Sequence, residues 1–136
     1  MADEEDAVSI RLLIADDHAL VRSGLRSMLQ REPGIEIVGE ACNGREAVEL
    51  CRSLVPNLVL MDVRMPEMDG LEATRTIKHE CPETGILMVT MHENPDYMLE
   101  AIKAGAAGYV LKDAARDELV DVVQRVACSA DPDTVP

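Results

Sequence analysis

Five polar residues follow or close short apolar runs at four points of the chain. Asp16 and Asp17 come after "IRLLIA", and Asp62 comes after "LVLM". Thr90 closes "ILMVT", and Lys112 follows "GYVL". Carboxylates, a hydroxyl and an ammonium group could together hold a divalent cation and a phosphoryl group, because phosphoryl transfer depends mainly on positioning and charge. The set therefore suggests phosphoryl chemistry.

Each of these residues has a simpler structural interpretation when it is taken alone. An Asp-Asp pair after a strand commonly caps a helix, and a single aspartate at a strand end is commonly a turn residue. A threonine fits a strand end because it is β-branched, and a lysine after an apolar run is commonly a solvated charge. The hypothesis of a site therefore depends on whether the fold brings all five residues to one place.

The segments that must position these residues alternate in type along the chain. Short strand-like runs lie at 10–15, 35–41, 58–61, 86–90 and 108–111. Apolar residues recur at helical spacing after each run, and the expected inner faces are Val21, Leu25, Met28 and Leu29; Ala47, Val48 and Cys51; Leu71, Thr74 and Ile77; Met98, Ala101 and Ile102; and Leu119, Val122, Val123 and Val126. Asn43 and Asn94 are predicted N-caps, with Pro95 at the first helical position, and a further helix is expected to begin at Gly70.

Five strand–helix units in series predict an α/β fold with a doubly wound, five-stranded parallel sheet. Strands with little alternation between apolar and polar residues are typical of sheets buried on both faces, and right-handed crossovers place helices on both sides. The carboxyl ends of parallel strands lie at one edge of the sheet, where such folds bind ligands. We therefore expect all five polar residues at that edge.

Three carboxylates at one edge repel each other. Two charges ~4 Å apart at an effective dielectric constant near 20 cost roughly 4 kcal/mol, so a purely structural role does not explain Asp16, Asp17 and Asp62 together. A hard divalent cation removes the conflict, and Mg²⁺ prefers a few carboxylates with its other positions left to water and phosphate oxygens. Thr90 and Lys112 would then contact the phosphoryl group.

The composition indicates one soluble globular domain. The chain has 136 residues, of which 47% are hydrophobic and 29% charged, enough apolar mass for a single core. No run approaches the ~20 apolar residues of a membrane span and the start is acidic, so we expect a cytoplasmic protein without membrane contact. The net charge of −13 repels nucleic acid, and four cysteines without a CxxC spacing indicate idle thiols in a reducing compartment.

Four motifs resemble those of the response-regulator receiver domain of bacterial two-component signalling. They are "ADDH" at 15–18, "MDVRMPEMDG" at 61–70, the threonine at 90 and "GYVLK" at 108–112. The resemblance covers residues 9 to about 128 and implies a flavodoxin-like (βα)5 fold with strand order 2-1-3-4-5. That order would make the first and third strands neighbours, so Asp17 and Asp62 would meet.

The resemblance also implies how the acidic residues act. Asp62 would accept a phosphoryl group from the phosphohistidine of a sensor histidine kinase. Mg²⁺, for which Mn²⁺ can substitute, would be held by Asp16, Asp17, Asp62 and the backbone carbonyl of Arg64. The domain would be a signalling module and not an enzyme, although it would carry intrinsic autophosphorylation and autodephosphorylation chemistry.

The remaining site residues would bind the phosphoryl group or respond to it. By the same resemblance, Thr90 and Lys112 would contact phosphoryl oxygens, and Thr90 would pair with Tyr109 in a switch whose ring moves inward on phosphorylation. Arg64 and His92 occupy positions that vary in the family. We expect these two to set how fast the acyl phosphate hydrolyses.

Longer stretches such as "IADDHALVRSGLRSML" and "AGAAGYVLKDA" resemble the NarL/FixJ-LuxR subgroup, in which a linker joins the receiver to a LuxR-type DNA-binding domain. We therefore expect residues 9–128 to form the receiver domain, residues 1–8 an acidic leader, and residues 129–136 a tail or the start of a linker to an absent output domain. Transcription would be controlled through that domain by an active homodimer. A stand-alone receiver that acts through protein–protein contact is the alternative.

Two further points concern the surroundings of the site. Many receivers follow the lysine with proline through a cis peptide bond, whereas Asp113 follows Lys112 here. A cis bond without proline costs about 3–4 kcal/mol, so none is assumed. Leu20 and Gly24, on the exposed side of the first helix, are candidates for kinase docking.

Three other classes fit the sequence less well. Hydrolases that form an aspartyl phosphate typically carry a DxD motif at the first strand, whereas the aspartates here are adjacent and the nucleophile lies on the third strand. A flavodoxin-like nucleotide or flavin binder would need a Gly-rich loop where "ADDHAL" stands. A degenerate receiver that signals without phosphate is disfavoured because Asp17, Asp62, Thr90 and Lys112 are all present.

Overall fold

The computed structural model describes residues 9–91 and 94–129. The elements in chain order are β1 (Ile10–Ala15), α2 (Ala19–Leu29), β2 (Ile35–Ala41), α3 (Gly44–Leu54), β3 (Leu58–Asp62), α4 (Gly70–Glu80), β4 (Gly85–Thr90), α5 (Pro95–Ala104), β5 (Gly108–Leu111) and α6 (Arg116–Ser129). All strands pair in parallel in one sheet of order β2-β1-β3-β4-β5. This confirms the predicted fold class and strand order.

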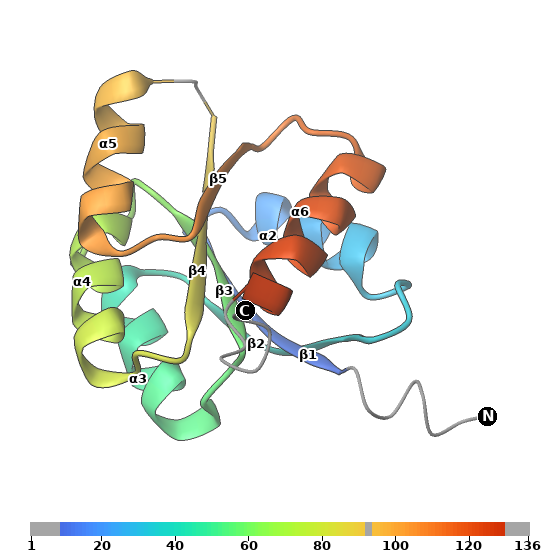
Figure 1. The fold of residues 1–136 in the computed structure, drawn as a ribbon, viewed down its shortest axis with the longest axis horizontal. Helices are drawn as coiled ribbons and strands as arrows, with labels where there is room; N and C mark the ends of the chain where they lie inside the picture. The colour runs from blue at the N-terminus through green and yellow to red at the C-terminus, as the bar shows by residue number, and fades with distance from the viewer. Residues whose placement is uncertain (1–8, 92–93, 130–136) are drawn as a thin grey trace.

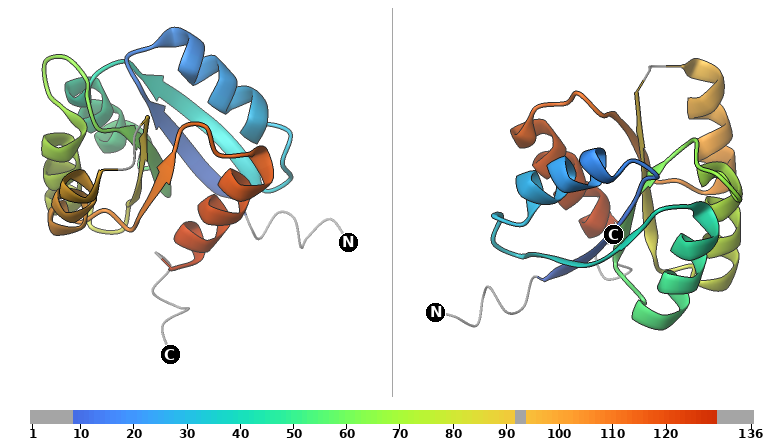
Figure 2. Two further views of the ribbon diagram at one scale, coloured as in Figure 1. Left: turned by 90° about the horizontal axis from the view of Figure 1, so that it is seen from above. Right: turned by 180° about the vertical axis from the view of Figure 1, so that it is seen from behind.

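Helices cover both faces of the sheet. In Figures 1 and 2, α3, α4 and α5 lie on one face, and α2 and α6 lie on the other. Successive residues of β3 point to opposite faces, so Val59 and Met61 belong to the core under α3–α5, whereas Leu58 and Leu60 belong to the core under α2 and α6. The interiors of β3 and β4 are therefore apolar on both faces, which is why these strands appear in the sequence as continuous apolar runs.

The predicted helix starts are confirmed by side-chain caps. Asn43 Oδ1 accepts a hydrogen bond from the Glu46 backbone N–H at 2.8 Å, and Asn94 Oδ1 accepts one from Asp96 at 2.9 Å. At the start of α4, Asp69 Oδ1 accepts one from Glu72 at 2.8 Å. Each cap satisfies a backbone donor that the first helical turn leaves free.

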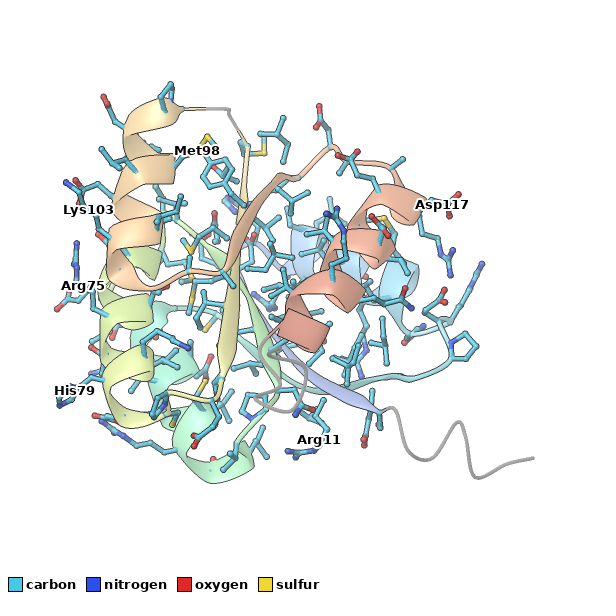
Figure 3. All side chains as sticks on the ribbon, in the orientation of Figure 1. Arg11, Arg75, His79, Met98, Lys103 and Asp117 are labelled. Carbon is cyan, nitrogen blue, oxygen red and sulfur yellow. The ribbon has the colours of Figure 1, made fainter. Side chains whose placement is uncertain are left out.

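The prediction that Ile102 lies on the inner face of α5 is wrong. Ile102 is 63% exposed, whereas Ala101 and Ala104 are buried, with only 1% and 7% of their surface exposed. A step of one residue turns a helix by about 100°, so burying Ala101 and Ala104 carries Ile102 to the outer face. Arg75 and His79 on α4 and Lys103 on α5 point away from the sheet on the same side (Figure 3).

Smaller differences affect the inner face of α4 and the start of β4. On α4 the buried positions are Gly70, Ala73, Thr74 and Ile77, and Leu71 is only half-buried. β4 begins at Gly85, one residue earlier than expected, because Gly85 pairs in register with Leu58 of β3.

The first residue of α4 makes a close backbone contact with the end of β3. A Cβ atom on Gly70 would lie 1.9 Å from the backbone oxygen of Asp62, a distance that no side chain can occupy. The Gly70 N–H also donates to the Val63 carbonyl at 2.8 Å. Glycine at this position therefore lets the helix N-terminus seat directly against the strand that carries Asp62.

We expect Gly70→Ala to destabilise the protein by about 2–3 kcal/mol, because a methyl group there forces the Asp62 backbone to move. Gly24→Ala is the matched control, since a Cβ atom on Gly24 would meet nothing within 4 Å. In the interior of α2 that change should stabilise by about 0.5–1 kcal/mol. Urea unfolding of both variants measures the difference, and equal stabilities would contradict the contact.

Candidate functional site

The five polar residues meet at the carboxyl edge of the sheet, as expected. Asp16 directly follows β1, Asp62 is the last residue of β3, Thr90 is the last residue of β4, and Lys112 directly follows β5. The register pairs Asp62 with Val89 and Thr90 with Leu111, so these strand ends lie side by side. The neighbouring positions of β1 and β3 place the residues after β1 beside Asp62.

An acidic cluster occupies this edge. Each of Asp16, Asp17, His18 and Asp62 offers one ligand atom, and these atoms all lie within 4.8 Å of one another. Asp16 is 1% exposed and Asp62 is 6% exposed, whereas Asp17 faces solvent. Hard carboxylate oxygens around a partly open position are the donor set that Mg²⁺ prefers. The residues present therefore fit the predicted metal.

His18 is a member of this cluster that the sequence analysis did not single out. Its Nδ1 atom lies 3.1 Å from Asp17 Oδ1 and 3.4 Å from Asp16 Oδ1. The only sequence signal for it was its place directly after the acidic pair. A histidine in this place does not identify a metal site by itself, because exposed histidines are also common on protein surfaces.

The backbone holds Asp16 firmly in place. Its N–H donates to the Ala41 carbonyl at 3.0 Å, and its own carbonyl accepts from Arg22 Nη1 at 2.6 Å. Its Oδ1 atom accepts from the His18 N–H at 2.8 Å. The N-cap residue of α2 is His18, which makes no side-chain cap bond. The acidic pair is therefore not a conventional helix cap.

Lys112 bridges two of the carboxylates. Its Nζ atom lies 2.7 Å from Asp16 Oδ2 and 3.4 Å from Asp62 Oδ1, and its side chain is 9% exposed. Burial lowers the pKa of the Lys112 ammonium, but the hydrogen bond to Asp16 and the charges of both carboxylates outweigh burial and raise it overall. Lys112 therefore stays charged next to the position that a phosphoryl group on Asp62 would take.

The environment of Asp62 opposes its negative charge. Burial raises the pKa of the Asp62 carboxyl to about 6, and the charges of Asp16 and then Asp17 add to the effect, while Lys112 acts against it. Like charges and low solvent access both disfavour ionisation. A cation bound to the cluster would relieve this conflict, which supports the fit to Mg²⁺.

The loop after Asp62 is anchored at several points. Met65 is buried, with 8% of its surface exposed. The Gly44 N–H at the start of α3 donates to the Met68 carbonyl at 2.9 Å. Glu67 adopts a positive φ of 67°, which reverses the chain before α4. These contacts fix the loop between Asp62 and the start of α4. Coordination by the Arg64 carbonyl stays a prediction.

The side chain of Arg64 makes a contact that the sequence did not predict. Its Nη2 atom donates a hydrogen bond to the Tyr97 hydroxyl, and its guanidinium carbon lies 5.4 Å from the centroid of the Tyr97 ring. The two residues are 33 positions apart, and Tyr97 stands in the first turn of α5. No local pattern signalled this pair, because the contact exists only through the packing of α5.

Two predicted switch residues occupy suitable positions. Thr90 is 7% exposed, and Tyr109 is half-buried against the core under α3–α5. Their movement stays a prediction. The described residues contain no cis peptide bond, so the Lys112–Asp113 bond is trans. His92, the second expected rate-setting residue, lies outside the described residues.

The family match decides which class this edge belongs to. The family described as the response regulator receiver domain matches residues 12–124. This chain belongs to the response regulator receiver domain family. The match decides against the hydrolase and the flavin-binder alternatives.

Individual relatives agree with the family match. The response regulator UvrY of Escherichia coli (strain K12) is 44% identical over 117 residues, which cover 86% of this chain and 54% of UvrY. The response regulator GacA of Pseudomonas aeruginosa is 41% identical over 117 residues, which cover 86% of this chain and 55% of GacA. The chain therefore spans about half the length of the curated relatives it matches.

Solved receiver structures have the same fold. The signal receiver domain of the response regulator NarL from Mycobacterium tuberculosis matches with a TM-score of 0.83 at 37% identity, covering 88% of this chain and 96% of that one. A two-component response regulator of the LuxR family from Aurantimonas matches with a TM-score of 0.85 at 37% identity, covering 93% and 92%. Among the described residues of this receiver, no helix combines the length and apolar character needed to cross a membrane.

The raised pKa of Asp62 predicts a pH-dependent effect on stability. The pKa of the Asp62 carboxyl rises from its ordinary value of 3.8 to about 6 in the folded receiver. The free-energy penalty of an ionised Asp62 therefore grows as the pH rises between these two values. In metal-free protein, the stabilisation by Asp62→Asn should increase by roughly 2 kcal/mol between pH 4.5 and pH 7.5.

Urea unfolding at the two pH values measures this effect. Asp117→Asn is the matched control, because the Asp117 side chain is 97% exposed on α6 (Figure 3) and is not part of the acidic cluster. A constant difference between the Asp62→Asn variant and the wild type at both pH values would show that Asp62 carries no such penalty.

Proposed function

We propose that this receiver accepts a phosphoryl group on Asp62 in a Mg²⁺-dependent reaction with a sensor histidine kinase, and acts as a signalling domain and not as an enzyme. The observation that carries the proposal is the arrangement around Asp62. Its Oδ1 atom lies 3.4 Å from Lys112 Nζ, and Asp16, Asp17 and His18 lie within the same small cluster. Membership of the receiver family supports the same chemistry.

The chemistry follows from the positions of these groups. An Asp62 carboxylate oxygen attacks the phosphorus of the kinase phosphohistidine, the new O–P bond forms as the P–N bond breaks, and the leaving imidazole keeps the electron pair and takes up a proton. Lys112 stabilises the phosphoryl charge, and Thr90 offers a hydroxyl to a phosphoryl oxygen. Bound Mg²⁺ would supply positive charge between the carboxylates and the phosphoryl oxygens.

The proposed output proceeds through Thr90 and Tyr109. When Thr90 turns toward the phosphoryl group it vacates space beside β5, and the half-buried ring of Tyr109 can move inward. Tyr109 and Met98 line one pocket together with residues of α6, so movement of the ring alters a surface formed by α5, β5 and α6. Such a switch changes packing at a distance from the reacting group.

The relatives support transcription control as the final output. UvrY and GacA are response regulators about twice as long as the matched segment, and a transcriptional regulatory protein, MctR of Rhizobium johnstonii, matches at 37% identity. We propose that this receiver controls a LuxR-type DNA-binding domain and forms a homodimer when active. Its net charge of −13 disfavours direct DNA contact by the receiver. A stand-alone receiver that acts through protein–protein contact is the alternative.

The direct test is incubation with Mg²⁺ and acetyl phosphate, followed by intact-mass measurement. We expect one added phosphoryl group on the wild type and none on Asp62→Asn or in the presence of EDTA. An adduct that persists on Asp62→Asn would place the acceptor elsewhere. If the wild type carries no adduct, a beryllofluoride titration decides between rapid hydrolysis and a receiver that does not use phosphate.

Kinase docking is proposed to involve the exposed side of α2. Leu20 is 85% exposed and lies one turn from Gly24, next to the acidic cluster. Leu20→Asp should slow transfer from a phosphorylated kinase by roughly tenfold, because an exposed apolar anchor is lost. Labelling by acetyl phosphate should not change.

The matched control for docking is Val55→Asp. Val55 is also an exposed apolar residue, at 60%, but it follows α3 at the opposite edge of the sheet. Transfer rates are measured by rapid quench with the purified kinase. Equal slowing by both substitutions would point to the added charge and would remove the assignment to α2.

A further inference from the structure

We propose that Tyr97 is a positioning residue for Arg64, and that it shortens the lifetime of the phosphoryl group on Asp62 by holding the Arg64 guanidinium away from it. The inference rests on the proposed function. It assigns a role to a residue of α5 that neither the motifs of the sequence nor the acidic cluster includes.

The contact between the two side chains is specific. Arg64 Nη2 donates to the Tyr97 hydroxyl, and the guanidinium carbon lies 5.4 Å from the ring centroid, within the range of a cation–π interaction. Tyr97 itself packs against the core under α3–α5. The tyrosine is therefore a fixed partner, and the arginine is an exposed side chain that can exchange partners.

Other cations already pair with carboxylates near Arg64. Lys112 pairs with Asp16 and Asp62, and Arg45 pairs with Glu67 in the same loop as Arg64. Within residues 9–91 and 94–129, Arg64 forms no ion pair with a carboxylate. Among these residues its partners are a neutral hydroxyl and an aromatic ring, both of Tyr97.

Phosphorylation of Asp62 would offer Arg64 a stronger partner. A phosphoryl group brings nearly two negative charges to a position two residues away, and two residues span at most about 7 Å of backbone. Charge-assisted bonds between arginine and phosphate are roughly twice as strong as bonds between neutral groups. The guanidinium would therefore divide its time between Tyr97 and the phosphoryl oxygens.

The fraction of time that the Arg64 guanidinium spends on Tyr97 determines how exposed the acyl phosphate on Asp62 is to water. Arg64 is exposed on the loop that follows Asp62, so a guanidinium that leaves Tyr97 for the phosphoryl oxygens would shield the phosphoryl group from water. Each moment spent on Tyr97 uncovers the phosphoryl group. Loss of the Tyr97 hydroxyl should consequently slow hydrolysis, and loss of the Arg64 side chain should accelerate it.

A double-mutant cycle on the lifetime of phosphorylated Asp62 tests the inference. The four proteins are the wild type, Tyr97→Phe, Arg64→Ala and the double variant, each labelled with acetyl phosphate and followed by intact mass after donor removal. Tyr97→Phe should lengthen the lifetime by about two- to fivefold, the lower part of the range for one hydrogen bond, because this contact is exposed to solvent. In the Arg64→Ala background the same substitution should have no effect.

A matched control separates this role from a general effect on α5. Arg75 on α4 also reaches α5, where its Nη2 atom lies 3.8 Å from Glu100 Oε1, but it points away from the site (Figure 3). Arg75→Ala should leave the lifetime unchanged. A lifetime that Tyr97→Phe shortens, leaves unchanged, or alters equally in both Arg64 backgrounds overturns the inference.

A second measurement reads the contact directly. The chain has two tyrosines and no tryptophan, so fluorotyrosine labelling yields two resonances, and Tyr97→Phe identifies that of Tyr97. Beryllofluoride should shift this resonance in the wild type toward its position in Arg64→Ala. A resonance that does not move overturns the inference while Asp62 still accepts phosphate, whereas absence of any adduct on wild-type Asp62 removes the proposed function and the inference together.

Discussion

The buried charges at the carboxyl end of β3 are the constraint on which the rest of the site depends. Asp62 is almost fully enclosed, shares its surroundings with Asp16, and is only partly compensated by Lys112. Burial and like charge together raise the pKa of its carboxyl to about 6. A protein built for stability alone would not keep this arrangement, because an apolar residue at a strand end carries no such penalty. The arrangement fits the proposed binding of a cation and a phosphoryl group.

The surrounding scaffold keeps these charges from relaxing apart. Asp16 is held through its backbone by Ala41 and Arg22, and Asp62 is fixed at the end of a strand buried on both faces. The backbone of α4 seats against the Asp62 carbonyl because residue 70 lacks a side chain. A rigid edge of this kind positions reacting groups without reorganisation when the reaction occurs.

Arg64 and His18 are exposed side chains next to this edge. Arg64 is exposed and contacts Tyr97 of α5, while His18 approaches the carboxylates from the open side. The outer face of α5 also carries Ile102 and Leu99, which are 63% and 53% exposed. The Arg64 side chain therefore links the loop after Asp62 to α5, the helix that also carries this exposed apolar face.

Much of this receiver followed from the sequence by itself. Continuous apolar runs, asparagine caps and helical spacing determined the fold class and most element bounds, because local propensity and burial pattern agree in a parallel α/β fold. The motifs identified the five polar residues, since strand ends in such sheets share one edge. The strand order, by contrast, came from family resemblance and not from any local pattern.

Only the tertiary structure decided how the side chains meet. The sequence placed Ile102 in the core, but the packing of two alanines turns it to solvent. For His18 the sequence signal was only its place after the acidic pair, and the contact of Tyr97 with Arg64 had none, because both contacts depend on the angle at which a loop or helix packs on the sheet. Spacing along the chain determines which strand end a residue occupies. Side-chain partners 33 positions apart are set by packing geometry, which no local pattern encodes.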